Sequence, residues 1–103
     1  VDPNVGVEGG DAAVLALAPP APNPGQGTAL LRFSLPAQAL VALEILDVSG
    51  RRVEHLEAEM PPGAHAWSWE GTAADGTRVG AGLYFVRLRV AGATDTRPVV
   101  KLR

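Results

Sequence analysis

The stretch WEGTAADGTRVGAGLYFVRL, residues 69–88, decides the fold of this chain. It ends one strand-like run, crosses a loop of small residues and glycines, and opens a second run in which apolar side chains recur at every other position. Asp75-Gly76 is typical of a tight turn, because glycine accepts the positive φ angles that such turns need. The pattern predicts two strands of a β-sheet joined by a structured loop, and it contains no grouping typical of a catalytic centre.

Alternation with a period of two continues on both sides of this stretch. It gives seven expected strands, at residues 12–18, 28–35, 41–46, 51–58, 64–70, 82–90 and 94–102. Turns rich in Pro, Gly and Asp separate them, and no segment of useful length shows the period of a helix. We therefore expect an all-β fold, a seven-stranded antiparallel Ig-like β-sandwich over residues 12–103. Residues 1–11 are expected to form a linker or a flexible N-terminal arm that can be exchanged between copies.

One face of each expected strand carries the side chains that we assign to the core. In the last strand, Val100 and Leu102 are the expected inward pair. Leu56 is out of phase with Val53, which indicates a β-bulge in that strand. Both tryptophans share a phase with His65, which favours packing of that face. The full expected core consists of Leu31, Phe33, Leu35, Val41, Leu43, Ile45, Trp67, Trp69, Tyr84, Val86 and Leu88.

Composition and charge exclude several classes of function. The chain has 103 residues, which is the size of one domain, and it has no cysteine, which excludes a disulfide framework, a thiolate metal site and a cysteine nucleophile. Its formal net charge is −2, and we expect no nucleic-acid partner, because such proteins carry a basic patch or stripe. No apolar run approaches the roughly 20 residues of a membrane span. The chain begins without an initiating Met, so we expect a processed product, an excised domain or the ordered part of a longer protein.

The residues that could carry chemistry are few and scattered. His55 and His65 fall on different expected strands, and an acid–base or metal role would need converging carboxylates or a nucleophile. Asp47, Glu70 and Asp75 offer oxygen atoms, but their loops lack the dense spacing of a dedicated calcium site, so we assign them to turns. We therefore expect no catalytic residue, no metal and no cofactor, and we expect that the chain is not an enzyme.

Several short motifs follow one another in an order that resembles a known family. They are PNP (22–24), TALLRFSLP (28–36), DVSGRRV (47–53), PPGAH (61–65), WEG (69–71), DGTRV (75–79), GLYFVRL (82–88) and VKLR (100–103). With this order, nearly the whole chain from residue 12 resembles the C-terminal Ig-like domain of many large secreted bacterial proteins. It is similar both to the Ig-like domain of the flagellar hook-capping protein and to the type A C-terminal sorting domains of the type IX secretion system.

The resemblance implies an accessory role outside the cell. It implies a non-enzymatic module, extracellular or at the cell surface, that sorts or anchors an exported protein or serves as a spacer, with protein partners such as the secretion machinery. The chain lacks a run of lysines near its end, where only Lys101 and Arg103 are basic, and this departure weakens the sorting interpretation. It also has Glu70 where the family usually has the Asp of a WDG motif. The residues carried over from the sorting motifs are Asp47, Gly50, Arg51, Gly82, Tyr84 and Lys101.

Two other functions stay open at the level of the residues. The chain could be a self-assembling subunit of an extracellular fibre or surface layer, a homo-oligomer in which the apolar, Gly-rich segment 1–18 adds a strand to a neighbour's open sheet edge. It could also be a carbohydrate-binding module, which requires Trp67, Trp69 and Tyr84 to be exposed together on one face. A domain with so few aromatic residues favours placing them in the interior.

Overall fold

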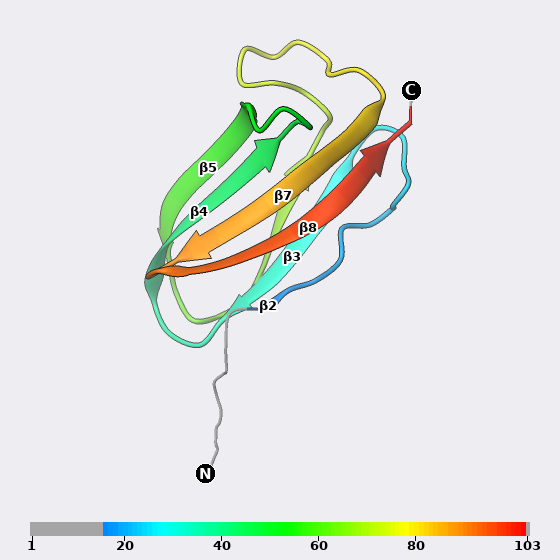
Figure 1. Ribbon diagram of the computed structural model, residues 1–103. Helices are drawn as coiled ribbons and strands as arrows, with labels where there is room; N and C mark the ends of the chain where they lie inside the picture. The colour runs from blue at the N-terminus through cyan, green and yellow to red at the C-terminus, as the bar shows by residue number, and fades with distance from the viewer. Residues whose placement is uncertain (1–15, 103) are drawn as a thin grey trace.

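The computed structural model describes residues 16–102, which form two antiparallel sheets packed face to face (Figure 1). One sheet has the order β2-β3-β6 and the other has the order β5-β4-β7-β8. The strands are β2 (Ala16–Leu17), β3 (Ala29–Leu35), β4 (Ala39–Leu46), β5 (Arg52–Met60), β6 (Gly63–Trp69), β7 (Gly82–Val90) and β8 (Ala93–Lys101). The described residues contain no helix.

The all-β class and the two antiparallel layers of an Ig-like fold agree with the prediction from the sequence. The expected first strand, residues 12–18, is described only at Ala16–Leu17, so the count of seven full strands stays a prediction. Residues 1–11, the expected arm, lie outside the described residues, as do residues 12–15 and Arg103.

The core lies between the two sheets and is built from the inward phase of each long strand. Trp69 is 1% exposed, and Leu43 and Leu88 are fully buried. Trp67, which the sequence places in the core, is only half-buried and packs at the margin of the cluster. The other buried apolar side chains are Leu17, Ala29, Leu31, Phe33, Leu35, Val41, Ile45, Val53, Tyr84, Val86, Val90 and Val99.

Strand β5 contains the irregularity that Leu56 indicates. Ile45 pairs with Glu54, whereas the next residue, Leu46, pairs with Arg52, so Val53 is an extra residue opposite β4. A bulge of this kind shifts the alternation by one position. Val53 and Leu56 therefore both contact the core although they lie three positions apart in the strand.

The inward pair of strand β8 differs from the sequence prediction. Val99 and Lys101 face the interior, whereas Leu102 is 46% exposed. The register with β7 explains this, because Val99 pairs with the buried Tyr84, and directly opposed residues share a face of the sheet. The prediction that Val100 and Leu102 point inward was wrong. It was based on the hydrophobicity of these residues, whereas the pairing of β8 with β7 determines which of its residues face the core.

The proline-rich segment before β3 covers the free edge of β8. The side chain of Asn23 donates from Nδ2 to the carbonyl of Pro98 (3.1 Å) and accepts at Oδ1 from the N–H of Val100 (2.9 Å). Gly25 continues this contact, donating to the carbonyl of Val100 and accepting from the N–H of Leu102. A Cβ at Gly25 would lie 2.6 Å from a ring carbon of Pro22, so only glycine fits there. One of the sheet edges that strand exchange would need is thus already partly occupied.

Candidate functional site

The residues that match the sorting motifs meet at one end of the sandwich. Asp47, Arg51 and Tyr84 line one pocket of about 450 Å³, and Lys101 lines a second pocket of about 370 Å³. Residues 78–80 line both pockets. This end therefore brings together segments that are far apart in the sequence: the β4–β5 turn, the start of β7 and the end of β8. Strand β2 lies at the opposite end of the sandwich (Figure 1).

Asp47 organises the turn between β4 and β5. Its Oδ1 accepts hydrogen bonds from the N–H of Ser49 (2.9 Å), the hydroxyl of Ser49 (2.7 Å) and the N–H of Arg51 (3.0 Å). The hydrogen bond from the Ser49 hydroxyl is the main reason why the pKa of Asp47 is lower than usual. Gly50 closes the turn at φ +88°, a conformation that other residues rarely adopt. The carboxylate thus holds the turn through Oδ1, as its assignment to a turn predicts, while its Oδ2 lies 3.3 Å from Nε of Arg51.

Asp75 forms the same kind of turn in the loop before β7. Its Oδ1 accepts from the N–H (2.9 Å) and the hydroxyl (2.7 Å) of Thr77, and this hydroxyl is the main cause of its lowered pKa. Gly76 follows at φ +90° and donates to the carbonyl of Ala73. The two turns are close chemical equivalents, and only the first belongs to the residues carried over from the sorting motifs.

Tyr84 connects the loop before β7 to the core. Its hydroxyl donates to the carbonyl of Gly80 (2.7 Å), while its ring packs edge-on against Trp69 with 5.4 Å between the ring centres. The indole N–H of Trp69 donates to the carbonyl of Thr72 (2.9 Å). Both rings are buried, so the exposed platform of Trp67, Trp69 and Tyr84 that glycan binding would need is not formed.

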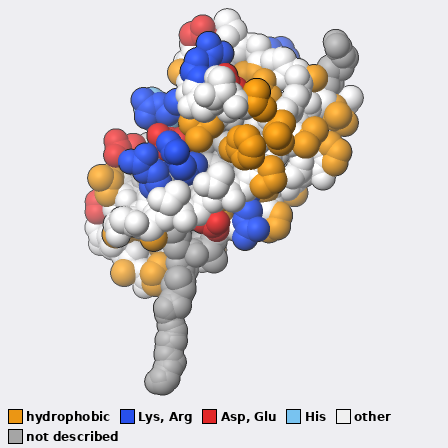
Figure 2. Space-filling model, viewed as in Figure 1, with side chains coloured by type: hydrophobic (Ala, Val, Ile, Leu, Met, Phe, Trp, Pro, Cys, Tyr) orange, Lys and Arg blue, Asp and Glu red, His pale blue; other side chains and the backbone are white. Residues whose placement is uncertain are grey.

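The outward face of the four-stranded sheet carries an apolar area next to a charged one. The register places side chains of β4, β7 and β8 side by side there, and Leu83 is 39% exposed. Figure 2 shows apolar side chains gathered over the start of β7 and the end of β8, with Arg side chains beside them. We call this area the outer apolar patch; it consists of Leu46, Leu83, Phe85, Pro98 and Val100.

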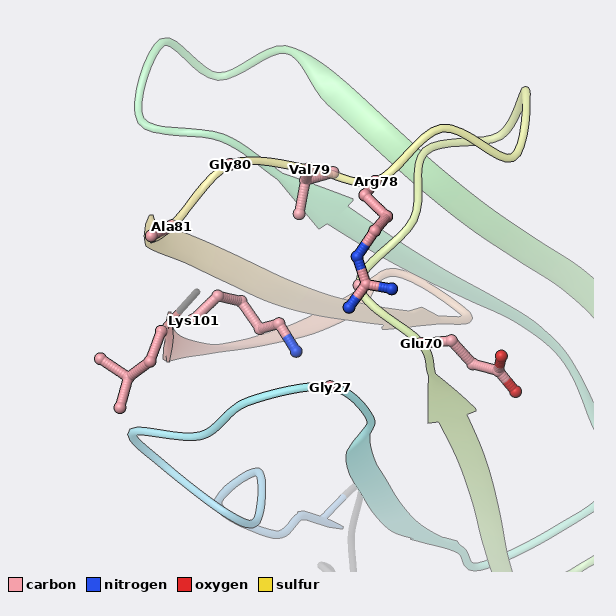
Figure 3. A pocket seen from close by; sticks show the side chains of 9 residues that line it. Gly27, Glu70, Arg78, Val79, Gly80, Ala81 and Lys101 are labelled. Atoms are coloured by element: carbon pink, nitrogen blue, oxygen red, sulfur yellow. The ribbon is translucent and has the colours of Figure 1, made fainter.

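Lys101 is buried in the second pocket, beside the outer apolar patch but facing inward. Figure 3 shows its side chain among the residues that line this pocket. Lys101 is 6% exposed, and its Nζ lies 5.4 Å from the centre of the Trp69 ring. Burial, and after it the charge of Arg78, lowers the pKa of Lys101. Among residues 16–102, no hydrogen-bond partner is found for this Nζ. No pattern in the sequence indicated that this lysine, at the end of a strand, faces the interior.

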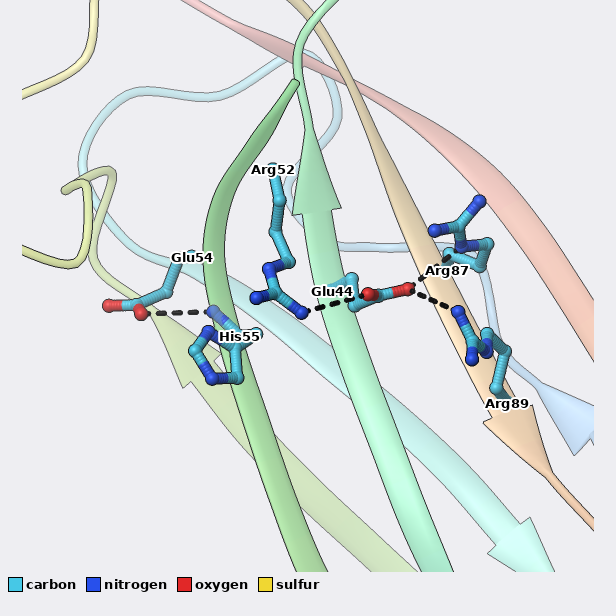
Figure 4. A network of polar contacts seen from close by, with 6 residues as sticks. All are labelled: Glu44, Arg52, Glu54, His55, Arg87 and Arg89. Carbon is cyan, nitrogen blue, oxygen red and sulfur yellow. Dashed lines mark hydrogen bonds and ion pairs between the residues drawn. The ribbon is translucent and has the colours of Figure 1, made fainter. Parts of the chain in front are cut away.

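Glu44 is the second buried charge, and sequence reasoning missed it. Its carboxylate is 8% exposed and contacts three arginines on the outward face: Arg87 (2.8 Å), Arg52 (3.3 Å) and Arg89 (3.5 Å) (Figure 4). Burial acts to raise the pKa of Glu44, but hydrogen bonds from Arg87 and Arg52 and the nearby positive charges outweigh it, so the pKa lies below its usual value. The signal in the sequence was a lone acidic residue in an apolar strand, opposite a strand with arginines at alternate positions.

Acid is expected to remove the contribution of Glu44 to stability. Its pKa is lower in the folded chain than the unfolded value of 4.5, so the contribution is present above pH 4.5 and is lost as the pH falls through the folded value. Glu44→Gln should lower the free energy of unfolding by about 1–2 kcal/mol at pH 7, a modest figure because the arginines are partly exposed. Urea titrations at pH 7 and pH 3 measure this, and the difference between the two chains should shrink at pH 3. An unchanged difference would contradict the role assigned to the carboxylate.

Within residues 16–102, no three His, Asp or Glu side chains come together in a way that could hold a metal ion. His65 instead stacks on Phe33, with 5.4 Å between the ring centres, and its Nε2 contacts the carbonyl of Pro61 (2.7 Å). None of the described residues belongs to a helix long and apolar enough to cross a membrane.

Comparison with known proteins agrees with this architecture. The model of the FlgD Ig-like domain matches residues 21–94. The chain belongs to the FlgD Ig-like domain family. FlgD from Xanthomonas campestris, described as essential for flagellar assembly through hook capping, is 26% identical with a TM-score of 0.60; the alignment covers 84% of this chain and 66% of that one. No curated protein matches the sequence.

Two much larger proteins of Porphyromonas gingivalis contain a domain of the same fold. Latent PorU is 23% identical with a TM-score of 0.70, and the alignment covers 86% of this chain and 9% of PorU. PorZ, described as an essential bacterial surface component of the type IX secretion system, is 20% identical with a TM-score of 0.59; the alignment covers 91% of this chain and 12% of PorZ. The chain therefore spans about a tenth of each of these proteins.

Proposed function

We propose that the chain is a recognition module of an exported bacterial protein, which sorts or anchors that protein at the cell surface and does not carry its catalysis. The observation that supports this most directly is the meeting of Asp47, Arg51, Tyr84 and Lys101 at one end of the sandwich. A partner protein could contact all of these segments at once.

The relatives support the same interpretation. The fold occupies about a tenth of PorU and of PorZ, as expected for a module added to a larger protein. Among the described residues, Phe33, Trp69 and Tyr84 are buried in the core, and the turn carboxylates Asp47 and Asp75 accept hydrogen bonds from backbone N–H groups. What remains for partners is the surface at this end and the outer apolar patch.

We expect Asp47→Ala to reduce surface delivery at least tenfold in a bacterium with a type IX system. The whole chain would be fused behind a signal peptide and a reporter protein, and delivery would be measured as reporter on intact cells relative to reporter retained in the periplasm. The physical reason is that Asp47 fixes the backbone of residues 47–51, which presents Arg51 beside Tyr84.

Glu54→Ala is the matched control, because it also removes a carboxylate that accepts a backbone N–H, that of His55, but Glu54 lines neither pocket at this end. The sorting role predicts normal delivery of the Glu54 variant, with similar melting temperatures for both purified variants. Normal delivery of Asp47→Ala would mean that the module is a spacer, and the sorting proposal would be wrong.

A second candidate is self-assembly through strand exchange, which the outer apolar patch favours because exposed apolar areas often mark protein contacts. Within the described residues, β6 pairs only with β3, which leaves one edge for a further strand. The free edge of β5 is a poorer acceptor, since it carries Glu54, Glu57 and Glu59.

Removal of residues 1–11 should abolish any polymers while the sandwich still folds. Analytical ultracentrifugation of the full and shortened chains at the same concentration measures the first effect, and circular dichroism checks the second. If the shortened chain assembles as the full chain does, strand exchange by this segment is excluded.

A further inference from the structure

The pocket that holds Lys101 has the features of a binding site for a negatively charged group. It lies between the turn at Gly27, the end of β6 and the start of β7, and its volume is about 370 Å³. Figure 3 shows two cationic groups, the Nζ of Lys101 and the guanidinium of Arg78, directed toward the same space. The carboxylate of Glu70, which also lines the pocket, is turned away from both in that view.

The ammonium group of Lys101 is costly to bury as it stands. It is desolvated, it lies near the like charge of Arg78, and the structure of residues 16–102 gives it no hydrogen bond. Its one favourable partner is the face of Trp69, at 5.4 Å. Buried charges are normally paired, and an ammonium can donate three hydrogen bonds, so an anionic partner would complete this site.

The backbone around the ammonium group is shaped to make room for it. A Cβ at Gly71 would lie 3.2 Å from both Cε and Nζ of Lys101, and Gly71 has φ +75°, so glycine suits this position for two reasons. The Arg78 side chain is exposed, so its guanidinium can change rotamer and admit a ligand next to the buried Nζ. The buried side chain of Lys101 and the backbone at Gly71 are thus held in place, while the exposed side chain of Arg78 can change rotamer.

We propose that this pocket is a carboxylate-binding site in which Lys101 and Arg78 together hold one carboxylate group. An arginine fork accepts a planar carboxylate through two parallel hydrogen bonds, and the lysine adds a point charge from the other side. Val79, Ala81 and Leu102 line the same pocket and provide apolar contacts for the carbon part of the ligand. Such a carboxylate is carried either by a small organic acid or by a peptide of a protein partner.

The experiment uses the signal of Lys101 itself, because it is the only lysine of the chain. The full chain, labelled with ¹³C at the lysine Cε, would be titrated at constant ionic strength with propionate, a short peptide with a free terminal carboxylate, its amidated form, phosphate and chloride. We expect a saturable change of the Cε shift, and a rise of the Lys101 pKa, with the carboxylates but not with the amidated peptide or chloride.

The arms of the titration separate the possible sources. Tighter binding of the carboxylate peptide than of propionate, by tenfold or more, assigns the site to a peptide, whereas equal or tighter binding of propionate assigns it to a small acid. If the carboxylates gave only a response without saturation, equal to those of phosphate and chloride, general ionic effects would explain it and the proposal would be overturned.

Variants test whether the two cations are responsible. Arg78→Gln should weaken carboxylate binding at least tenfold, and in Lys101→Met, followed through the Trp69 indole N–H, the response should disappear. Arg32→Gln, which alters an exposed arginine on β3 away from the pocket, should bind normally.

Glu70→Gln tests whether the chain fills the site with its own carboxylate. If the pocket serves an external carboxylate, this variant should bind at least as tightly as the natural chain. Binding that appears only in Glu70→Gln, together with a fall in the Lys101 pKa, would show an internal ion pair and overturn the proposal. These measurements use the purified chain, so their outcome is separate from any result on sorting.

Discussion

Trp69→Ala is expected to lower the free energy of unfolding by about 3–5 kcal/mol, the largest effect of any single truncation in this domain. The indole is 1% exposed and fills the space between the end of β6 and the start of β7. Its removal also leaves the carbonyl of Thr72 without its N–H donor and removes the ring that faces Tyr84. A domain of this size has about 5–15 kcal/mol of stability in total, so the loss is a large part of it.

Urea unfolding followed by far-ultraviolet circular dichroism measures this loss. Trp67→Ala is the matched control, because Trp67 lies on the same strand and the same phase but is only half-buried. We expect a cost of about 1–2 kcal/mol for it. If the two variants were equally destabilised, or if Trp69→Ala melted like the natural chain, the packing described for Trp69 would be wrong.

The sequence predicted β3, β4 and β7 well because each of these strands has one apolar face. In β3 and β4 the alternating residues, such as Leu31 and Leu43, are those that the structure buries. Turns were predictable for a similar local reason, since Asp47 and Asp75 bond to backbone N–H groups within the next few residues. Information of this kind lies within a few neighbouring positions.

What the sequence could not provide depends on contacts between distant segments. The inward phase of β8 is set by its register with β7, and hydrophobicity alone favoured the opposite phase. The role of Asn23 depends on a strand that follows about 75 residues later in the chain. Glu44 is buried because arginines of two neighbouring strands cover it, and no local pattern shows that.

The candidate site could be predicted only in part, because it too depends on contacts between distant segments. The motif residues could be named from the resemblance, but not their meeting at one end around residues 78–80. Arg78 was not singled out at all, since an isolated arginine in a loop looks like any solvated charge. Its importance follows only from its position near a buried lysine.

Lys101→Met is expected to stabilise the chain, by about 1–2 kcal/mol at pH 7. Methionine has a similar length and flexibility, and it can pack on Trp69 without a desolvated charge. The gain is partial because the ammonium group's contact with the ring, worth about 0.5–2 kcal/mol, is lost. For a domain of this size the melting temperature should rise by about 4–8 °C for each kcal/mol gained.

The pH dependence gives this prediction a second, independent check. The pKa of Lys101 is lower in the folded chain than the unfolded value of 10.5, so between these two values the unfolded chain binds more protons. The natural chain should therefore gain stability as the pH rises through that window, and Lys101→Met should not. Thermal melts of both chains at pH 7, 9 and 10.5 measure the difference, which should narrow toward alkaline pH.

Arg32→Met serves as the control for a general effect of removing one positive charge, because Arg32 is exposed on β3. Its melting temperature should stay within about 2 °C of the natural chain, since exposed substitutions usually change stability little. A loss of stability in Lys101→Met would mean that the ammonium group is well paired in solution. A gain, combined with the loss of carboxylate binding, would mean that the chain keeps a destabilising lysine because the charge is needed for recognition, as sites for function often require.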